Sequence, residues 1–208
     1  EYPKFNSGVI TREDKSRKTF YQSLSKINFL KLSSKNKDDF IEDLKMNIFI
    51  KNERGVLNPR IIQLIERTTQ FNSYPKTYNN NLLYDVIQNG NKLYSVSVDD
   101  KFSKKEIVSS FVLDENKDFI IIKIIVFSCR FLGRKVEDVI FNFILLKAKK
   151  LNKGVKILYK KTDRNKLFRE HMKAINLNKK TNYFYKDFNK LNEVIISIPK
   201  LNSYNTNE

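Results

Sequence analysis

The chain has 208 residues, and its 40 lysines and arginines against 23 aspartates and glutamates give a formal net charge of +17. Hydrophobic residues make up 40% of the chain, which is enough for a folded core and excludes a wholly disordered protein. One cysteine and one histidine exclude an internal disulfide and argue against a His/Cys metal site, so we expect no metal. No apolar run approaches the ~20 residues of a membrane helix and no signal peptide is visible, which predicts a cytoplasmic protein without membrane contact.

The positive charge does not by itself identify a partner. Nucleic acid, an anionic membrane surface, a phosphate-bearing cofactor and an acidic protein all attract a basic protein. Lysine and asparagine are scattered along the whole chain, and there is no helix-turn-helix or aromatic β-platform signature. Specific nucleic-acid binding is therefore the weakest of these alternatives.

The first half of the chain predicts a connector followed by mixed helices and strands. A helical pattern over Thr11–Ile27 indicates a connector helix within residues 1–35, and the main domain is expected over residues 36–200. Asn58-Pro59 is a strong helix start, because asparagine caps free amides and proline suits the first helical position. The elements expected here are a helix, a strand, two helices and two strands: Asp38–Leu44, Lys45–Ile50, Pro59–Gln70, 82–87, Lys92–Val98 and Glu106–Leu113.

The second half is organised around the most apolar strand. Phe119–Phe127 is almost wholly apolar, which is typical of a central strand buried on both faces. The elements expected after it are a loop, a long helix, a strand, a helix, two strands and a frayed tail: Ser128–Arg134, Lys135–Lys150, Val155–Tyr159, Asn165–Ile175, Asn182–Tyr185, Glu193–Ile198 and 201–208. From Lys45 on, the order is β-α-α-β-β-β-α-β-α-β-β, an α/β pattern with an antiparallel meander and a crossover helix.

The segment from Phe127 to Glu137 carries the sharpest chemical signal. A buried strand runs through a short loop with one glycine directly into a helix. The free amides and the dipole at such a helix start attract anions, and Gly133 permits close approach of a phosphate. Arg130, Arg134 and Lys135 add full positive charges. The alternative is an ordinary strand-to-helix turn with solvated arginines, and the local pattern does not decide between the two.

The order of elements resembles that of GNAT-type N-acetyltransferases, the acyl-CoA N-acyltransferase fold. The resemblance implies an α/β protein whose mixed central sheet is flanked by helices. In that fold a Gln/Arg-x-x-Gly-x-Gly/Ala loop holds the pyrophosphate of coenzyme A, and here it reads Arg130-x-x-Gly133-x-Lys135. Pantetheine is then expected to pair, like an added strand, with backbone between Phe119–Phe127 and Val155–Tyr159. The cofactor-binding residues that the resemblance implies are Phe127, Ser128, Arg130, Leu132, Gly133, Arg134, Lys135, Val136 and Phe168.

Three motifs resemble the C-terminal region of FkbH-like proteins, over about residues 10–177. They are Ile10–Tyr21, Arg60–Asn72 (RIIQLIERTTQFN) and Ser128–Glu137 (SCRFLGRKVE). In that family a haloacid-dehalogenase-type phosphatase domain precedes this region, and the whole protein loads a glyceryl group from a phosphorylated three-carbon acid onto an acyl carrier protein. The resemblance implies an acyltransferase for a small acyl group, with a pantetheine thioester of coenzyme A or of a carrier protein as its partner.

Two residues are candidates for catalysis. Cys129 is a candidate acyl-carrying nucleophile, because Arg130 and the adjacent helix start favour a thiolate. The alternative is a small buried residue at a strand end, which is the more common role of a free cysteine. Asn165 lies where the fold carries an asparagine and is the second candidate. Met172 takes the position that often carries a tyrosine general acid, so no hydroxyl is present there to protonate a leaving thiolate.

A polar helix face supplies the candidate substrate site. Gln63, Arg67 and Gln70 recur at i, i+4 and i+7 and share one face of the expected helix. The family resemblance implies a cleft lined by Arg67, Gln70 and Asn72, with Arg67 as the anchor of a carboxylate or phosphate. The alternative at this level is a solvated helix face. For the whole chain, the alternatives to an acyltransferase are a non-catalytic docking module for pantetheine or a carrier protein, and a nucleic-acid-binding protein.

Overall fold

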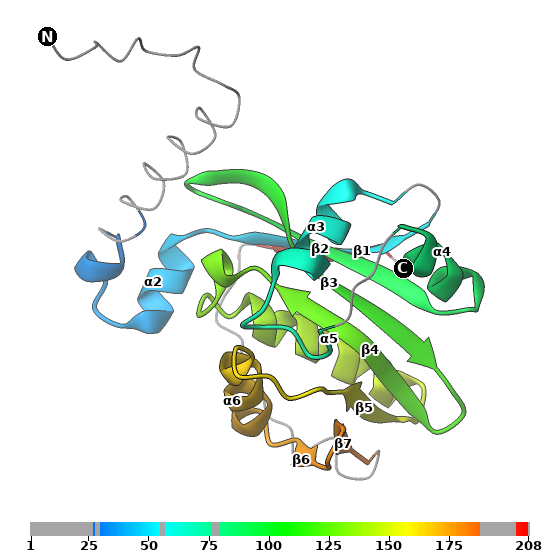
Figure 1. The fold of residues 1–208 in the computed structure, drawn as a ribbon. Coiled ribbons are helices and arrows are strands. Elements are labelled where there is room, and N and C mark those ends of the chain that lie inside the picture. The colour runs from blue at the N-terminus through cyan, green and yellow to red at the C-terminus, as the bar shows by residue number, and fades with distance from the viewer. Residues whose placement is uncertain (1–26, 28–29, 55–56, 76–79, 188–202, 208) are drawn as a thin grey trace, which may run out of the picture.

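The structure is a computed structural model that describes residues 27, 30–54, 57–75, 80–187 and 203–207. Figure 1 shows one twisted sheet with helices on both of its faces. Apart from Ile27, the expected helix Thr11–Ile27 lies outside the described residues, and so does the expected strand Glu193–Ile198. No helix within the described part of the chain is long and apolar enough to cross a membrane.

The strands of the described residues form one eight-stranded sheet in the order β6-β7-β5-β4-β3-β2-β1-β8. Strands β1 to β4 pair in antiparallel fashion, β4 and β5 are parallel, and β5, β7 and β6 continue in antiparallel fashion. The bounds of β1 to β8 in chain order are Asn47–Glu53, Lys92–Asp100, Ser103–Glu115, Phe119–Phe127, Gly154–Leu158, Asn178–Lys179, Tyr183–Lys186 and Ser203–Asn207.

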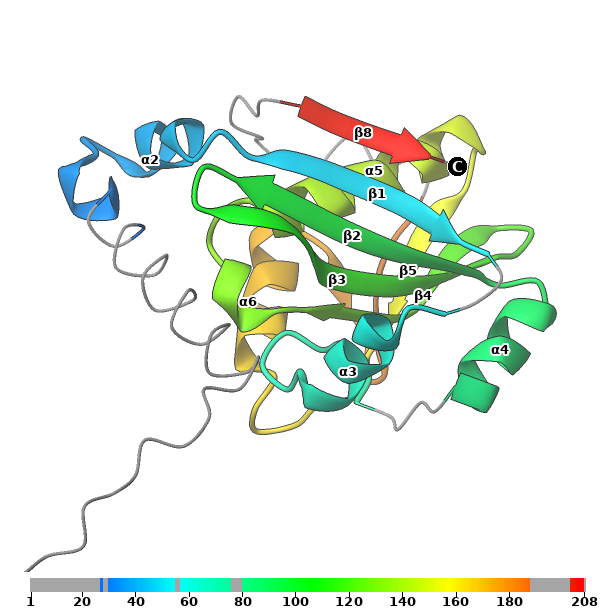
Figure 2. The same ribbon diagram turned by 90° about the horizontal axis from the view of Figure 1, so that it is seen from above.

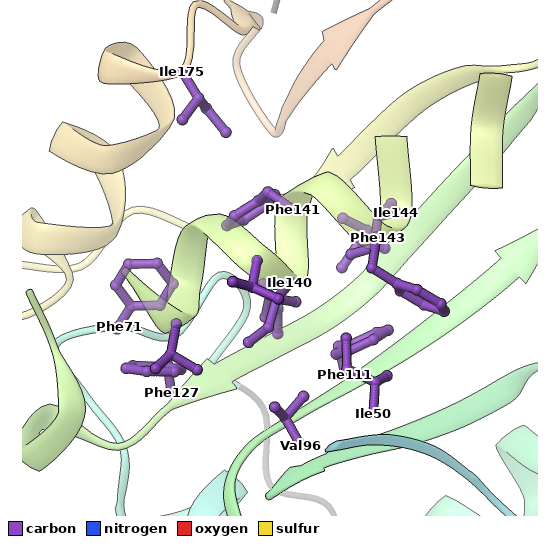
Figure 3. Close-up of a cluster of buried hydrophobic side chains, with 14 of the residues drawn as sticks. Ile50, Phe71, Val96, Phe111, Phe127, Ile140, Phe141, Phe143, Ile144 and Ile175 are labelled. Atoms are coloured by element: carbon purple, nitrogen blue, oxygen red, sulfur yellow. The ribbon is translucent and has the colours of Figure 1, made fainter. Parts of the chain in front are cut away.

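Helices cover the two faces of this sheet with two separate apolar cores (Figures 1 and 2). The larger core joins α2, α5 and α6 to one face. Figure 3 shows Phe143 of α5 near Phe111 of β3, while Phe141 of α5 lies on the side away from the sheet and packs against His171 of α6. The smaller core joins α3 and α4 to the other face through residues such as Ile61, Leu64 and Val126. The helix bounds are Lys37–Asp43 for α2, Pro59–Arg67 for α3, Asn80–Gln88 for α4, Val136–Lys150 for α5 and Lys166–Ala174 for α6.

Several expected element bounds change. Helix α3 ends at Arg67 and not at Gln70, because the backbone of Thr68 is already extended. The long helix α5 begins at Val136 and not at Lys135, because Lys135 has a left-handed backbone conformation with φ 64°. Part of the expected frayed tail is ordered, since Ser203–Asn207 form β8 and pair in parallel with β1. Without β8, β1 would be an edge strand with unpaired backbone groups, and the pairing satisfies them.

Candidate active site

Cys129 lies at the open surface immediately after β4, where the chain forms a single 3-10 turn over Cys129–Phe131. Its side chain is exposed, so the expectation of a small buried residue at the strand end is wrong. Together with three arginines it lines a pocket of about 330 Å³. We call this site the arginine pocket, and its lining residues are Arg60, Gln63, Leu64, Arg67, Thr68, Thr69, Gln70, Ser128, Cys129 and Arg130.

Helix α3 presents the polar wall of the arginine pocket. Its amides are capped by the Asn58 side chain, which accepts from the amide of Arg60 at 2.9 Å. Arg60 and Arg67 are seven residues apart and so lie on one face, while Ile61 and Ile65 on another face are buried against the sheet. Arg67 and Gln70, which the sequence predicted for the substrate site, line the same pocket as Cys129. The expectation that Gln70 shares a helix face with Gln63 and Arg67 is wrong, because α3 ends at Arg67. Sequence reasoning missed Arg60 as a lining residue, although it lies in the same motif.

The arginine pocket concentrates positive charge. Burial lowers the pKa of Arg60 below its usual value, and the nearby charges of Arg130 and Arg67 lower it further, while Glu106 acts in the opposite direction. Arg130 forms an ion pair with Glu106 at 2.9 Å, and the guanidinium of Arg60 donates to the side chain of Gln63. Because guanidinium groups bind carboxylates and phosphates with two parallel hydrogen bonds, the pocket suits a small anionic group.

Residues Phe71–Ser73, here called the edge segment, continue from the arginine pocket into the sheet. Strand β5 pairs with β4 only from Phe119 to Ile122, and the edge segment lies along the rest of that edge. The carbonyl of Phe71 accepts from the amide of Phe127 at 3.0 Å, and the Ser73 amide donates to the carbonyl of Ile125 at 3.1 Å. These are backbone groups of the edge with which pantetheine is expected to pair.

The other side of the edge segment is bonded as well. The carbonyl of Ser73 accepts from the amide of Lys160, just beyond β5, at 2.9 Å. The side-chain amide of Asn165 donates to the carbonyls of Asn72 and Lys160 at 3.0 and 2.9 Å. Nδ2 of Asn72 donates to the carbonyl of Thr68, and its Oδ1 accepts from the amide of Tyr74. Asn72 is 1% and Asn165 0% exposed, so the structure places both inside the fold and not at a substrate cleft.

The apolar cofactor-binding candidates are buried in the large core. Phe127, Val136 and Phe168 are each 0% exposed. The ring of Phe71 lies edge-on to those of Phe127 and Phe168, with centroids 5.8 and 5.4 Å away. Met172, at the usual tyrosine position, is also 0% exposed. These side chains therefore belong to the packed core and offer no accessible surface to a pantetheine chain.

In the loop that was expected to bind pyrophosphate, the hydrogen-bond donors are already bonded to carboxylates of this chain. The amide of Gly133 donates to Oε1 of Glu137 at 3.0 Å. The guanidinium of Arg134 bonds Asp100 at 2.9 Å, with the two side chains 9% and 0% exposed. Lys135 pairs with Asp138 at 3.2 Å. Burial raises the pKa of Glu137, and the amides of Glu137 itself and of Gly133 oppose that shift by donating to its carboxylate.

Taken with the edge segment, these contacts show that coenzyme A does not fit the slot that the fold usually offers it. The sequence predicted the loop as an anion seat, but it did not reveal that Glu137 and Asp100 already neutralise its donors. The signal that could have pointed to this arrangement is the acidic pair Glu137 and Asp138 in the first turn of α5, because carboxylates are stabilised at a helix N-terminus.

A second pocket of about 580 Å³ lies on the other side of Arg130. It is formed between α2, the residues before it and the loop from Arg130 to Arg134. The cofactor candidates Leu132 and Gly133 line it together with Lys31 and Lys37. Among the described residues, no group of three or more His, Cys, Asp or Glu side chains could hold a metal ion.

Comparison with solved structures finds several of similar fold. A domain from Methanocaldococcus jannaschii has a TM-score of 0.51 at 11% identity, covering 68% of this chain and 99% of that chain. A GNAT-family acetyltransferase from Staphylococcus aureus has a TM-score of 0.49 at 11% identity, covering 68% of this chain and 99% of that chain. One from Elizabethkingia anophelis with acetyl-CoA bound has a TM-score of 0.44 at 14% identity, covering 65% of this chain and 78% of that chain.

The comparisons support the fold and nothing finer. No family model matches the chain, and no curated protein matches it. The antiparallel meander, the parallel β4–β5 pair and the crossover by α5 reproduce the expected order of elements. The predicted acyl-CoA N-acyltransferase fold is therefore confirmed, while the resemblance to FkbH-like proteins stays a prediction.

Proposed function

We propose that this chain is an acyltransferase that carries a small acyl group on Cys129, between an activated donor and a pantetheine thiol. The observation that supports it most is the position of Cys129. It is exposed at the end of β4 and lies in the same pocket as Arg67 and Gln70, which come from a segment some 60 positions earlier in the chain. The exposed thiol can react with an acyl carbon, while the neighbouring guanidinium groups bind a negative substituent of the same acyl group.

The proposed reaction has two displacement steps. The thiolate of Cys129 attacks the acyl carbon of the donor, an S–C bond forms, and the donor's leaving group departs with the electron pair of the broken bond. A pantetheine thiolate then attacks the Cys129 thioester, takes the acyl group and releases the Cys129 thiolate. In both steps Arg67 and Arg130 hold the anionic part of the acyl group and orient its carbonyl toward sulfur.

The charge of the pocket supports an acyl group that is itself anionic or is delivered as a phosphate. A glyceryl group from a phosphorylated three-carbon acid meets that requirement. The resemblance to FkbH-like proteins, carried in part by the Ser128–Glu137 motif, implies the same group. Acyl carrier proteins are acidic, so the net charge of +17 supports a carrier protein as the source of the pantetheine thiol. A separate haloacid-dehalogenase-type phosphatase domain would remove the phosphate.

The test is acyl loading of a phosphopantetheinylated carrier protein, followed by intact mass spectrometry of the carrier. With the acyl phosphate of glyceric acid as the donor, we expect the wild-type chain to load the acyl group and so increase the mass of the carrier protein. Cys129→Ala should slow loading by at least about 100-fold, because the nucleophile is lost. Lys117→Ala, on the exposed β3–β4 turn at the opposite end of β4, is the matched control and should load normally. Loading by Cys129→Ala at the wild-type rate would refute the proposal.

A non-catalytic docking module is the second candidate. The observation that favours it is Met172, which is buried where the fold often carries a tyrosine acid. Binding of the carrier protein by a chain that loads no acyl group from any donor would establish this alternative.

A further inference from the structure

We infer that the edge segment is a built-in strand that permanently takes the place of pantetheine along β4, so that coenzyme A has no binding site between β4 and β5 of this chain. The thiol partner then reaches Cys129 from the solvent side of the arginine pocket, on a carrier protein. The approach of a carrier protein to Cys129 rests on the proposed function. The occupation of the β4 edge depends only on contacts of Phe71, Asn72 and Ser73.

The edge segment is bonded as a strand on both of its sides. Asn72 lies opposite Val126 in an antiparallel bridge. On the β4 side, the Ser73 hydroxyl also accepts from the amide of Ile125 at 3.1 Å, so Ile125 has both backbone groups engaged by Ser73. On the β5 side, Ser73 accepts from Lys160. A ligand that pairs with β4 by strand addition would have to break this whole set.

Burial shows that no space remains beside these bonds. Phe71, Asn72 and Ser73 are 2%, 1% and 0% exposed. The ring of Phe71 packs against Phe127, Phe168 and His171, with a centroid distance of 5.5 Å to His171. Displacing the edge segment would therefore expose an aromatic ring of the core and leave buried backbone groups unpaired.

The edge segment also separates the arginine pocket from the interior of the slot. Gln70 lines the pocket, and the next residue, Phe71, already bonds the amide of Phe127. Cys129 follows Phe127 by two positions and faces the exposed side. A thioester can approach Cys129 from solvent, whereas the route between β4 and β5 is closed by Phe71–Ser73. This geometry selects a thiol presented at the surface over one threaded through the sheet.

Amide hydrogen exchange and calorimetry on the full chain test the inference. In the wild type we expect slow exchange at Ile125, Phe127 and Lys160, and we expect coenzyme A or acetyl-CoA, added up to about 1 mM, to leave that slow exchange unchanged. Binding that leaves the protection of Ile125 and Phe127 unchanged places the ligand outside the slot and supports the inference. Saturable binding up to about 1 mM that exposes these amides, or fast exchange at them without ligand, overturns it.

A matched pair of variants strengthens the exchange experiment. Ser73→Ala removes the acceptor of the Ile125 amide and should raise exchange there by at least about 10-fold. Ser110→Ala also removes a buried hydroxyl, which donates to the carbonyl of Tyr94 on β2 and makes no bond to Ile125, and should leave the exchange of the Ile125 amide unchanged. Equal effects of the two variants would contradict a strand role for Ser73. Failure of Cys129 loading with protection intact would refute the proposed function alone.

Discussion

The side-chain amide of Asn165 donates a hydrogen bond to the backbone carbonyl of Asn72 at 3.0 Å, joining residues 93 positions apart. Its oxygen accepts from the amide of Thr162 and from the guanidinium of Arg169 at 3.0 and 2.9 Å. Both ends of the Asn165 side chain are thus engaged inside the fold. Asn165 is a positioning residue that fixes the edge segment against the sheet.

Asn165→Ala should destabilise the protein by about 2–4 kcal/mol, because several buried polar groups lose their partners at once. The measurement is the free energy of unfolding from a urea titration. Asn182→Ala, at an exposed side chain, is the control and should change stability by less than about 0.5 kcal/mol. Similar stability of the two variants would show that Asn165 does not hold the edge segment.

The backbone conformation of Lys135 is one that glycine adopts more easily than other residues, so glycine at this position should stabilise the fold relative to alanine. Its φ of 64° and ψ of 7° lie in the left-handed region, and the related motif of the fold has glycine or alanine here. Lys135→Gly and Lys135→Ala both remove the ion pair with Asp138, so their difference isolates the backbone. We expect the glycine variant to be more stable than the alanine variant by about 1 kcal/mol in urea unfolding. Equal stability would show that the backbone is unstrained.

His171 and Glu137 should make stability depend on pH in opposite directions. Burial lowers the pKa of His171, Asp138 opposes this, and Lys135 adds to the decrease. The folded state therefore binds fewer protons at His171 than the unfolded state, and stability is lost as the pH falls below about 6.5. Burial raises the pKa of Glu137, so this group adds stability as the pH falls toward about 4.5.

Melting temperatures at about pH 7.5 and pH 5.5 separate the two groups, since His171 titrates between them when unfolded. His171→Gln should lose less stability than the wild type on acidification. When the series is extended to about pH 4.5, Glu137→Gln should lose more stability than the wild type, because it removes the opposing contribution. An acid-induced change in Tm that is identical in all three proteins would contradict both assignments.

Much of the fold could be predicted because its signals are local. Asn58 caps α3 as expected, and the bounds Phe119–Phe127 of β4 follow from one apolar run. The edge segment could not be predicted in this way, because the Ser73–Ile125 hydrogen bond joins residues 52 positions apart. The exposure of Cys129 is likewise set by the turn after β4 and not by its own hydrophobicity.

The arginine pocket predicts how its anion affinity responds to mutation. Phosphoglycerate, a phosphorylated three-carbon acid, should bind Arg67→Ala at least about 10-fold more weakly than the wild type, because a charged hydrogen-bonding partner is lost. Arg67→Lys should restore only part of the affinity, since an ammonium lacks the two-pronged geometry of guanidinium. Isothermal calorimetry gives the Kd values, with Lys117→Ala as a control of equal charge loss. If Lys117→Ala weakened phosphoglycerate binding equally, the loss of affinity in Arg67→Ala would come from the change in net charge and not from a direct contact with Arg67.

Trapping of an acyl group on Cys129 tests the central claim most directly. Because the chain has one cysteine, an intact mass spectrum after incubation with an acyl donor identifies the site without ambiguity. We predict a mass increase equal to the acyl group in the wild type, its removal by hydroxylamine, and no increase in Cys129→Ala. Loading of a carrier protein with no adduct ever forming on the wild-type chain, or an adduct that persists in Cys129→Ala, would contradict the account.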